Sequence, residues 1–528
     1  CGPTQDSQPA HAPCGGLTSD PALRMAGDTA LPRYLVLILA PLAGAMVTLS
    51  LAPFDAWPAG IAAAAVLAFL LCTCTTTQAV WRGWLFGLGL FGTGASWVYV
   101  SIHVHGHASP LLAGILTALF CMGLALFHAL FGWLYVRFVR ALPGGMLIGF
   151  PVLWVLFEWL RSWVLTGFPW LLLGYAHIET PLAGWAPIVG VYGLSFICAV
   201  TGACLFLAWR SRQAMACITY AVIVAVLWIG GGILKPIQWV AQASQEPLSV
   251  AIYQPNVPQE NKWDRAYYQP ILTQMRSATQ PLLGHDIVVW PEAAIPNIYQ
   301  RTRSYLDPIA RRSALTDTTL ILGIPNRPAG EERIYNSVVA LGHGEGRYLK
   351  RRLVPFGEYV PLEYYLRGMI DFFDLPMSFM SSGPEKQDPL RAGAFRVAPS
   401  ICYEVVYPDL VAAGARNAEL LITVSNDSWF GRSIGPLQHL QMARMRALEN
   451  GRYLIRGTNN GVSAIIDHRG QLLASTGQFV EASLVGEVVP MLGRTPFASF
   501  GSIPVVAGCG LALLLMLLMY LSFWREQD

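Results

Sequence analysis

The distribution of charge along the chain constrains its fold more than any other feature. Charged side chains are sparse from Tyr34 to Leu234, dense and of mixed sign from Glu246 to Pro490, and absent again from Pro504 to Trp524. Only 13% of the residues are charged, whereas soluble domains usually carry about a quarter. The two apolar regions therefore predict helices with lipid as their solvent, and the charged region between them predicts an extramembrane domain.

The apolar regions predict about eight membrane spans. A helix needs about 20 mostly apolar residues to cross the roughly 30 Å hydrocarbon core of a bilayer. The segments that meet this requirement are approximately residues 34–52, 58–76, 83–102, 110–136, 146–166, 185–208, 214–234 and 502–523. The expected fold is thus a seven-helix transmembrane bundle at 34–235, an α/β domain at 247–490 and a final transmembrane helix at 502–524. Residues 1–33 are expected to be a disordered tail or an upstream extension, with Met25 as a candidate start.

Basic residues near the span ends predict the orientation. The ends on one side carry Arg33, Arg82, Arg137, Arg140, Arg210, Arg212 and Arg525, whereas the opposite ends carry little beyond Arg161 and Lys235. Because Lys and Arg favour the cytoplasmic side, both termini are expected in the cytoplasm and the α/β domain on the opposite side, which in a bacterium is the periplasm. The net charge of +3 and the lack of a long basic run argue against a nucleic-acid partner.

Cys402 is the single cysteine of the charged region among ten in the chain. Proteins of an oxidising compartment usually pair their cysteines in disulfides, and Cys402 has no partner within its own domain. A buried thiol that serves only as a small apolar side chain is one interpretation. A reactive nucleophile is the other.

The charged region alternates strand-like and helix-like segments, which is typical of a layered α/β domain. The predicted strands are Leu248–Tyr253, Asp286–Trp290, Thr319–Gly323, Tyr335–Leu341, Phe395–Ile401, Glu419–Val424, Tyr453–Thr458 and Val462–Asp467, and a helix is predicted at Pro436–Asn450. Polar residues follow several of these strands, at the positions where active sites of such sheets tend to lie.

Three of these polar residues form a chemically coherent set. Glu292 can take the proton of the Cys402 thiol, and Lys350 can stabilise the thiolate and then a tetrahedral oxyanion. The backbone N–H of Tyr403 is a natural second donor to that oxyanion. The set predicts acyl transfer, although any one Glu or Lys is more often a solvated surface residue.

Several motifs resemble the nitrilase superfamily, and within it the apolipoprotein N-acyltransferases. The motifs are Trp290-Pro291-Glu292-Ala293-Ala294-Ile295-Pro296, the stretch Leu353–Pro361, Cys402-Tyr403-Glu404, Asn426-Asp427-Ser428-Trp429-Phe430-Gly431 and the helix Gln441–Glu449. The resemblance covers essentially Pro32 to Trp524. It implies an αββα sandwich inserted before the last of about eight membrane helices. It implies no metal and no cofactor.

The resemblance also implies a two-step, ping-pong reaction in the bacterial inner membrane. Cys402 attacks the acyl ester of a phospholipid, expected to be phosphatidylethanolamine, and becomes a thioester. The N-terminal amine of a diacylglyceryl-cysteine on an apolipoprotein then accepts the acyl group. Glu292 serves as base and acid, and Lys350 as oxyanion partner. Supporting roles are implied for Glu358, Tyr403, Glu404, Asn336, Trp263 and Trp429, with simple packing as the alternative for the two tryptophans.

The segment Met369–Met380 is rich in Phe and Met. It is expected to be an arm that dips toward the bilayer, or else a buried core segment. His103, His105 and His107 alternate at the end of the third span and are interpreted as an interfacial polar cap rather than as metal ligands.

Glu158 and Arg161 lie three residues apart in the fifth span, where charges are costly, and are expected to pair with each other. The segment Thr166–Trp170 after them is expected under the α/β domain, where it either borders the route of lipid access or has a structural role.

Two other classes of function stay open at this point. One is a nitrilase-type amidase that is merely anchored in the membrane, for which a single helix would suffice. The other is a transporter or receptor, which would need more polar residues in its spans than this chain has.

Overall fold

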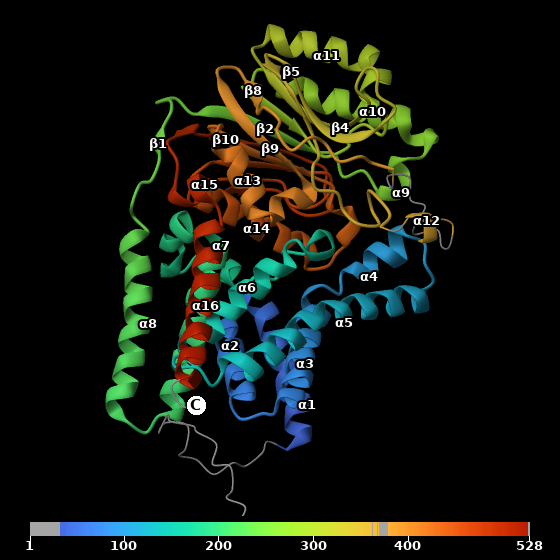
Figure 1. Cartoon of the computed structure of the whole chain (residues 1–528). Helices are drawn as coiled ribbons and strands as arrows, with labels where there is room; N and C mark the ends of the chain where they lie inside the picture. The colour runs from blue at the N-terminus through green and yellow to red at the C-terminus, as the bar shows by residue number, and fades with distance from the viewer. Residues whose placement is uncertain (1–31, 362, 367, 369–378, 526–528) are drawn as a thin grey trace, which may run out of the picture.

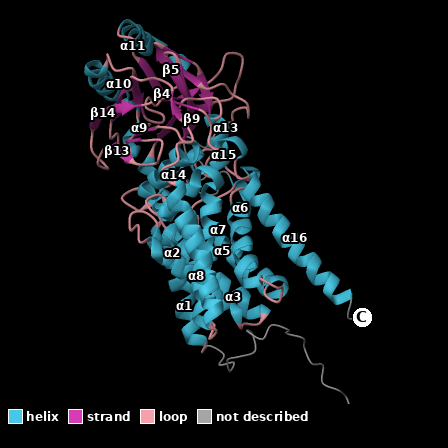
Figure 2. Cartoon of the chain, turned by 90° about the vertical axis from the view of Figure 1, so that its left-hand side faces the viewer, coloured by secondary structure: helices cyan, strands magenta, loops and turns pink. Residues whose placement is uncertain are grey.

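The computed structural model describes residues 32–361, 363–366, 368 and 379–525. Residues 1–31 of the predicted tail lie outside the described residues, whereas Arg33, the last residue of that tail, begins a helix. Most of the predicted arm, residues 369–378, is also not described. The described chain has two parts, a bundle of helices and an α/β domain that lies on one end of it (Figures 1 and 2).

The helical part contains seven long helices before the α/β domain and one after it. Their bounds are α1 Arg33–Ser50, α2 Trp57–Cys72, α3 Thr76–Gly94, α5 Pro110–Leu134, α6 Phe150–Arg161, α7 Ala186–Arg210, α8 Ala214–Leu234 and α16 Ile503–Arg525. In the described residues, four helices are long and apolar enough to cross a membrane, or five if the bent pair of Thr76–Gly94 and Val98–His105 is one span. A membrane region with several candidate spans is thereby confirmed.

The third predicted span, residues 83–102, is wrong in its bounds. Thr75 and Gln78 form a capping box that starts α3 at Thr76, well before the apolar stretch. The helix ends at Gly94, and the short helix α4 (Val98–Val100) and the turn Ser101–His105 continue at an angle of 59°. The fifth predicted span, 146–166, is also too long, because α6 ends at Arg161.

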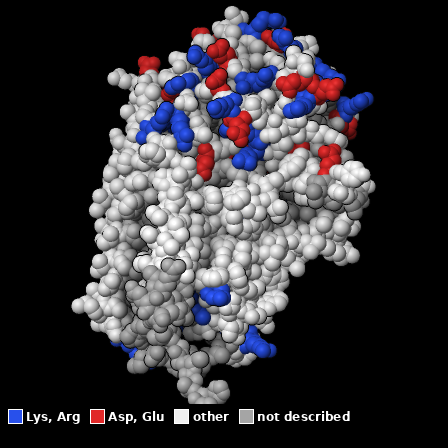
Figure 3. All heavy atoms as spheres, in the orientation of Figure 1, with Lys and Arg blue, Asp and Glu red and all other residues white. Residues whose placement is uncertain are grey.

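Charge on the surface follows the same division. Figure 3 shows Lys, Arg, Asp and Glu gathered over the α/β domain, whereas the face over the helices is almost free of charge. A few basic side chains lie near its far end. This distribution is typical of a protein whose helices contact lipid.

The α/β domain contains two sheets packed face to face. The six-stranded sheet has the order β14-β2-β3-β4-β5-β7, and the seven-stranded sheet the order β13-β12-β11-β10-β9-β8-β6. The strands are β2 Leu248–Gln254, β3 Ile287–Trp290, β4 Thr319–Asn326, β5 Tyr335–Gly342, β6 Gly344–Glu345, β7 Arg347–Leu349, β8 Leu390–Ala392, β9 Phe395–Ile401, β10 Leu420–Ser425, β11 Leu454–Thr458, β12 Ala464–Ile466, β13 Leu472–Ser475 and β14 Ala482–Val488. Each of the eight predicted strands overlaps an observed one.

Side chains that point alternately to the two faces of each strand give the domain four layers, in which two sheets lie between two layers of helices. In β3, Ile287 and Val289 enter the core between the sheets, whereas Val288 and Trp290 face helices α10 (Arg265–Thr279) and α11 (Arg303–Leu315). This period of two is the signature of a strand buried on both faces. Helices α13 (Pro408–Ala415) and α14 (Gly435–Asn450) cover the other sheet and share one apolar core with the membrane helices.

Candidate active site

Glu292 lies just past the end of β3 and is 7% exposed. Asn336 Nδ2 donates to its Oε1 at 2.7 Å, and Lys350 Nζ lies 3.4 Å from the same oxygen. The backbone N–H of Asn426 donates to Oε2 at 2.8 Å. Because each oxygen is held by a donor, the carboxylate has a fixed orientation.

Lys350 follows β7, is 1% exposed and lies between two carboxylates. Its Nζ is 2.9 Å from Glu358 Oε2, and Asn336 Nδ2 also donates to Glu358 Oε1 at 2.9 Å. Burial alone would lower the pKa of Lys350, but the Glu358 and Glu292 carboxylates outweigh it and raise that pKa. Lys350 therefore stays a cation at any physiological pH.

Cys402 directly follows the strand β9, which ends at Ile401, and begins a short 3-10 helix, Cys402–Val406. Its backbone is left-handed, with φ of 51°, which is uncommon for a residue with a side chain. Burial raises the pKa of the thiol, the Glu292 carboxylate raises it further, and Lys350 acts in the opposite direction. The resting thiol is therefore protonated and needs a base to become a nucleophile.

Glu404 joins the turn of Cys402 to the strand of Lys350. Its Oε2 accepts from the backbone N–H of Ile401 at 2.8 Å, and its Oε1 accepts from the N–H of Arg351 at 2.7 Å and from the hydroxyl of Tyr348 at 2.9 Å. One buried side chain thus connects the two sheets at the site.

Tyr403 points away from Glu292 and toward the membrane helices. Its hydroxyl donates to the Gly167 carbonyl at 2.9 Å, and its ring lies parallel to Trp170 with 6.5 Å between centroids. Tyr407 Oη similarly donates to the Thr166 carbonyl at 3.0 Å. The segment Thr166–Trp170 thus lies directly under the turn that carries Cys402, as predicted.

The two tryptophans do not contact the carboxylates. Trp429 packs edge-on against His105 at 5.3 Å, and its carbonyl accepts from the Ser101 hydroxyl at 2.7 Å, so it belongs to the contact with the helical part. Trp263 is half-buried and follows Lys262, whose Nζ donates to the Glu292 carbonyl at 3.1 Å.

The three alternating histidines have different surroundings. His103 Nδ1 lies 2.8 Å from the Ala108 carbonyl, and His105 Nε2 lies 2.8 Å from the Ser428 carbonyl. In the part of the chain that the structure describes, no group of three or more His, Cys, Asp or Glu side chains is placed to hold a metal ion.

The prediction that Glu158 and Arg161 pair with each other is wrong. Glu158 Oε1 accepts from the Trp154 indole and from the backbone N–H of Leu173, both at 2.9 Å. Arg161 Nη1 donates to the carbonyls of Phe168 and Trp170. Because α6 ends at Arg161, the chain folds back and supplies backbone partners that a continuous helix would not have.

Sequence reasoning missed Lys262 and a buried group behind Cys402, which comprises His439, Asp427 and Arg456. Lys262 is 2% exposed, and burial lowers its pKa to about 8, although Glu292 acts in the opposite direction. Asp427 belongs to one of the motifs identified in the sequence, but no local pattern indicates that its side chain contacts His439. Burial of a lysine next to a tryptophan likewise leaves no local signal.

Comparison with known proteins agrees with this geometry. The apolipoprotein N-acyltransferase N-terminal domain matches residues 43–204, and the carbon-nitrogen hydrolase domain matches residues 249–496. An apolipoprotein N-acyltransferase of Pseudomonas putida is 47% identical over 481 residues, which are 90% of this chain and 95% of that protein. Another from Coxiella burnetii is 40% identical over 92% of this chain and 99% of that protein. A solved nitrilase-superfamily structure from Saccharomyces cerevisiae matches 48% of this chain and 93% of that chain, at 21% identity and a TM-score of 0.35.

The chain therefore belongs to the apolipoprotein N-acyltransferase family. This confirms the predicted family and the predicted class of enzyme, an acyltransferase of lipoprotein biosynthesis with a nitrilase-like domain. The family implies a lipid acyl donor and a lipoprotein acceptor.

Proposed function

We propose that Cys402 carries the acyl group as a thioester between a phospholipid donor and the N-terminal amine of a diacylglyceryl-cysteine on an apolipoprotein. The observation that carries this proposal is the buried cluster of Glu292, Lys350 and Cys402, assembled from three strand ends directly above the membrane helices. The donor is expected to be phosphatidylethanolamine.

The first half-reaction acylates the enzyme. Cys402 Sγ attacks the ester carbonyl of the phospholipid while Glu292 takes the thiol proton. Lys350 and the backbone N–H of Tyr403 stabilise the oxyanion. The C–O bond then breaks, Glu292 returns the proton to the leaving alkoxide, and a lysophospholipid departs.

The second half-reaction regenerates the thiol. The acceptor amine attacks the thioester carbonyl, and Glu292 takes a proton from that nitrogen. The C–S bond breaks as the amide forms, and the proton returns to Cys402 Sγ. The low exposure of the cluster limits hydrolysis of the thioester by water.

The remaining site residues are proposed to support these steps. Glu358 and Asn336 hold Lys350 and Glu292 relative to each other, and Glu404 fixes the Cys402 turn. Tyr403 anchors that turn to the membrane segment below it. Trp263 and Trp429 are proposed to contact substrate, with Trp429 at the junction with the helices.

A membrane setting suits two lipid substrates. Each acyl CH₂ taken out of a bilayer costs about 0.8 kcal/mol if it reaches water, so a site at the bilayer surface spares the enzyme full extraction. We propose that all eight helices cross the bacterial inner membrane, with the α/β domain periplasmic. The basic side chains at the far end of the helical surface support this orientation.

The proposed division of the chain is a bundle at 34–235, a catalytic domain at 247–490 and a final span at 502–524. A membrane-anchored amidase is the weaker alternative, because the family match extends through the helices at residues 43–204.

The acyl-enzyme is tested by intact-mass spectrometry of the purified enzyme incubated with phosphatidylethanolamine. The expected result is one acyl adduct on wild type, its loss in Cys402→Ser, and its retention in the control Cys198→Ser, whose thiol is buried among the membrane helices. Addition of a diacylglyceryl-cysteine peptide should discharge the adduct into N-acyl peptide. An adduct that never forms, or that passes only to water, overturns the proposal.

Orientation is tested separately in intact cells by a thiol probe that cannot cross membranes. In a Cys402→Ser background, Leu315→Cys places a thiol at an 85% exposed position at the end of α11. It should react from the periplasm. The matched control Arg212→Cys, between α7 and α8, should react only after the membrane is ruptured. The reverse pattern contradicts the proposed orientation.

A further inference from the structure

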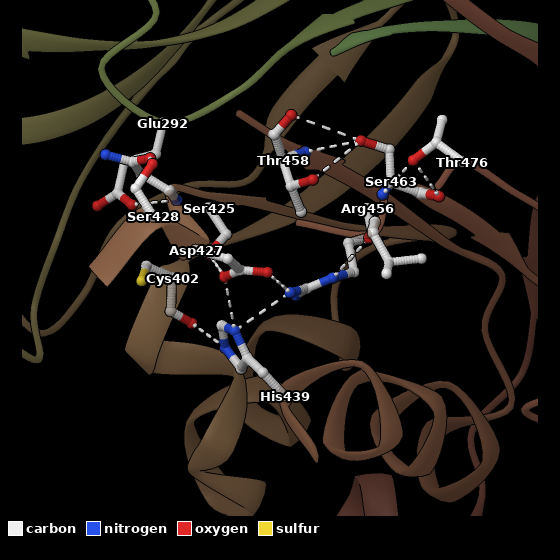
Figure 4. Close-up of polar contacts among 12 residues, drawn as sticks. Glu292, Cys402, Ser425, Asp427, Ser428, His439, Arg456, Thr458, Ser463 and Thr476 are labelled. Atoms are coloured by element: carbon white, nitrogen blue, oxygen red, sulfur yellow. Dashed lines mark hydrogen bonds and ion pairs between the residues drawn. The ribbon is translucent and has the colours of Figure 1, made fainter. Parts of the chain in front are cut away.

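A buried polar group lies behind Cys402, on the side away from Glu292 (Figure 4). It comprises His439 of α14, Arg456 of β11 and Asp427, which follows β10. All three residues are at most 1% exposed. Buried charges at this depth are retained only where they are paired and hydrogen-bonded, and the reaction steps above use none of them.

The contacts of His439 place a proton on Nε2. Nε2 lies 3.1 Å from the Cys402 carbonyl oxygen, which can only accept, so Nε2 carries a proton and donates it. Nδ1 lies 3.1 Å from Arg456 Nη2, which can only donate, and also 3.1 Å from Asp427 Oδ1, which can only accept. The Nε2 proton is thus directed at the nucleophile's backbone, and the charges around the ring decide the state of Nδ1.

Burial and the charge of Arg456 together favour a neutral imidazole, in which Nδ1 accepts from Arg456. Arg456 Nη2 is 2.7 Å from Asp427 Oδ2, and the Ser425 hydroxyl donates to Oδ1 at 2.6 Å. Burial and then Arg456 lower the pKa of His439, although Asp427 acts in the opposite direction. Burial would raise the pKa of Asp427, but Arg456 outweighs it and lowers that pKa. The charged pair and the neutral imidazole are thus mutually consistent.

The carbonyl that His439 holds belongs to a strained residue. A left-handed φ of 51° is unfavourable for a residue with a side chain and persists only where the surroundings enforce it. Figure 4 shows the sulfur and the carbonyl oxygen of Cys402 pointing to different sides, the oxygen toward His439. Holding the carbonyl therefore determines where the sulfur points.

The same turn of chain holds the base. Asn426 donates its N–H to Glu292 Oε2, and the next residue, Asp427, contacts Arg456 and His439. Base and nucleophile are thus held relative to each other through two adjacent residues.

We propose that His439 is a positioning residue for acyl transfer, which donates from Nε2 to the Cys402 carbonyl and holds the left-handed turn that directs Sγ toward Glu292. Arg456 donates to Nδ1 and so favours the tautomer that donates from Nε2. This inference rests on the proposed role of Cys402 as the acyl carrier.

The test compares His439→Phe, which keeps a ring but removes the donor, with His439→Gln, whose side-chain amide restores an N–H near the position of Nε2. The control is His468→Phe, because His468 stacks on Tyr453 away from this group. Acyl-adduct formation on the purified full chain is followed in time at saturating phosphatidylethanolamine, and the rate constant is separated from the amplitude. A folding defect lowers the amplitude, whereas misplacement of Sγ lowers the rate constant.

The expected result is a 10- to 100-fold lower rate constant in His439→Phe, recovery to within a few-fold of wild type in His439→Gln, and no change in His468→Phe. A wild-type rate constant in His439→Phe overturns the inference. A rate constant in His439→Gln as low as in His439→Phe also overturns it. If wild type itself forms no adduct, the proposed function has failed instead.

Discussion

The two sheets of the α/β domain contribute different halves of the site and have different surroundings. The six-stranded sheet carries Glu292, Asn336 and Lys350, and its outer face is covered by α10 and α11. The seven-stranded sheet carries Cys402, and its outer face is covered by α13 and α14, which also pack on the membrane helices. The half with the proposed acid and base, here called the acid–base half, therefore lies away from the bundle. The half with Cys402, here called the docked half, packs on it.

Helix α14 shows what this difference means for the site. His439 contacts the Cys402 carbonyl, and the neighbouring Gln438 accepts from the Trp170 indole at 2.6 Å. Further along, Glu449 accepts from the backbone N–H of Val191 in α7 at 2.7 Å. One helix thus ties the turn of Cys402 to the helical bundle, whereas Glu292, the proposed base, belongs to the other sheet.

The largest effect is expected in the acid–base half, from Lys350→Met. Removal of this cation leaves Glu292 and Glu358 buried without it, which should destabilise the fold by about 3–5 kcal/mol. The acylation rate should also fall about 100- to 1,000-fold, through loss of an oxyanion partner. Chemical denaturation and the time course of adduct formation measure the two effects. The exposed Lys386→Met is the matched control, and equal behaviour of the two variants would refute the role of Lys350.

In the docked half, the free energy of unfolding should depend on pH through the carboxyl group of Glu449. Burial raises its pKa from 4.5 to about 7, although Arg446 acts in the opposite direction. A raised carboxyl pKa means that the folded state binds more protons than the unfolded state between these values. Protonation of Glu449 therefore stabilises the folded state fully below pH 4.5. This stabilisation, about 3 kcal/mol in total, is lost as pH rises through 7.

Unfolding in detergent at pH 5 and pH 8 measures this contribution. Glu449→Gln should flatten the difference between the two pH values, and the exposed control Glu487→Gln should leave it unchanged. A Glu449→Gln profile identical to that of wild type would show that this carboxyl does not titrate with folding.

A smaller effect is expected where the nucleophile turn meets the membrane segment. Tyr403→Phe leaves the Gly167 carbonyl without its 2.9 Å donor, although the Tyr407 hydroxyl lies 3.4 Å away and can compensate in part. We expect a loss of about 1 kcal/mol, read as a lower melting temperature. The 70% exposed Tyr365→Phe is the control. An unchanged melting temperature in Tyr403→Phe would mean that this hydrogen bond does not secure the docking.

The smallest effect is expected on the far side of the six-stranded sheet. Arg303 and Asp307 of α11 form an exposed pair at 3.7 Å. Arg303→Met should change the free energy of unfolding by less than about 0.5 kcal/mol. A loss of several kcal/mol would mean that this face of α11 is packed rather than exposed. The proposed difference between the surroundings of the two sheets would then be wrong.

Much of the α/β domain follows from local patterns, and its exceptions are informative. The eight predicted strands are β-branched, apolar runs closed by turn residues, and all are found. The sequence does not predict the short strands β6, β7, β8 and β13, nor the strand β14, Ala482–Val488, which contains Gly486 and whose side chains alternate between exposed and part-buried. Helices α10 and α11 were not delimited, because each has an interior proline, Pro270 and Pro308, which weakens the helical pattern.

The membrane part was predictable in composition but not in detail. Apolar content locates the helices, yet it does not reveal that Gly94, where α3 ends, packs so closely that a Cβ there would overlap the side chain of Leu171. Glu158 and Arg161 were paired on spacing alone. Apart from the Trp154 indole within the same helix, the hydrogen-bond partners found for them lie in the segment that folds back beneath the α/β domain.

The sequence by itself determined the division into lipid-facing and charged regions, the main strands, and the candidate trio of Glu292, Lys350 and Cys402. These properties depend on periodicity and residue chemistry within a few positions. Only the tertiary structure decided that Asn426 holds Glu292 from 134 residues away and that His439 holds the backbone of Cys402 from 37 residues away. Such partners meet because sheets and helices pack, and packing is set by the apolar faces of whole elements rather than by any local motif.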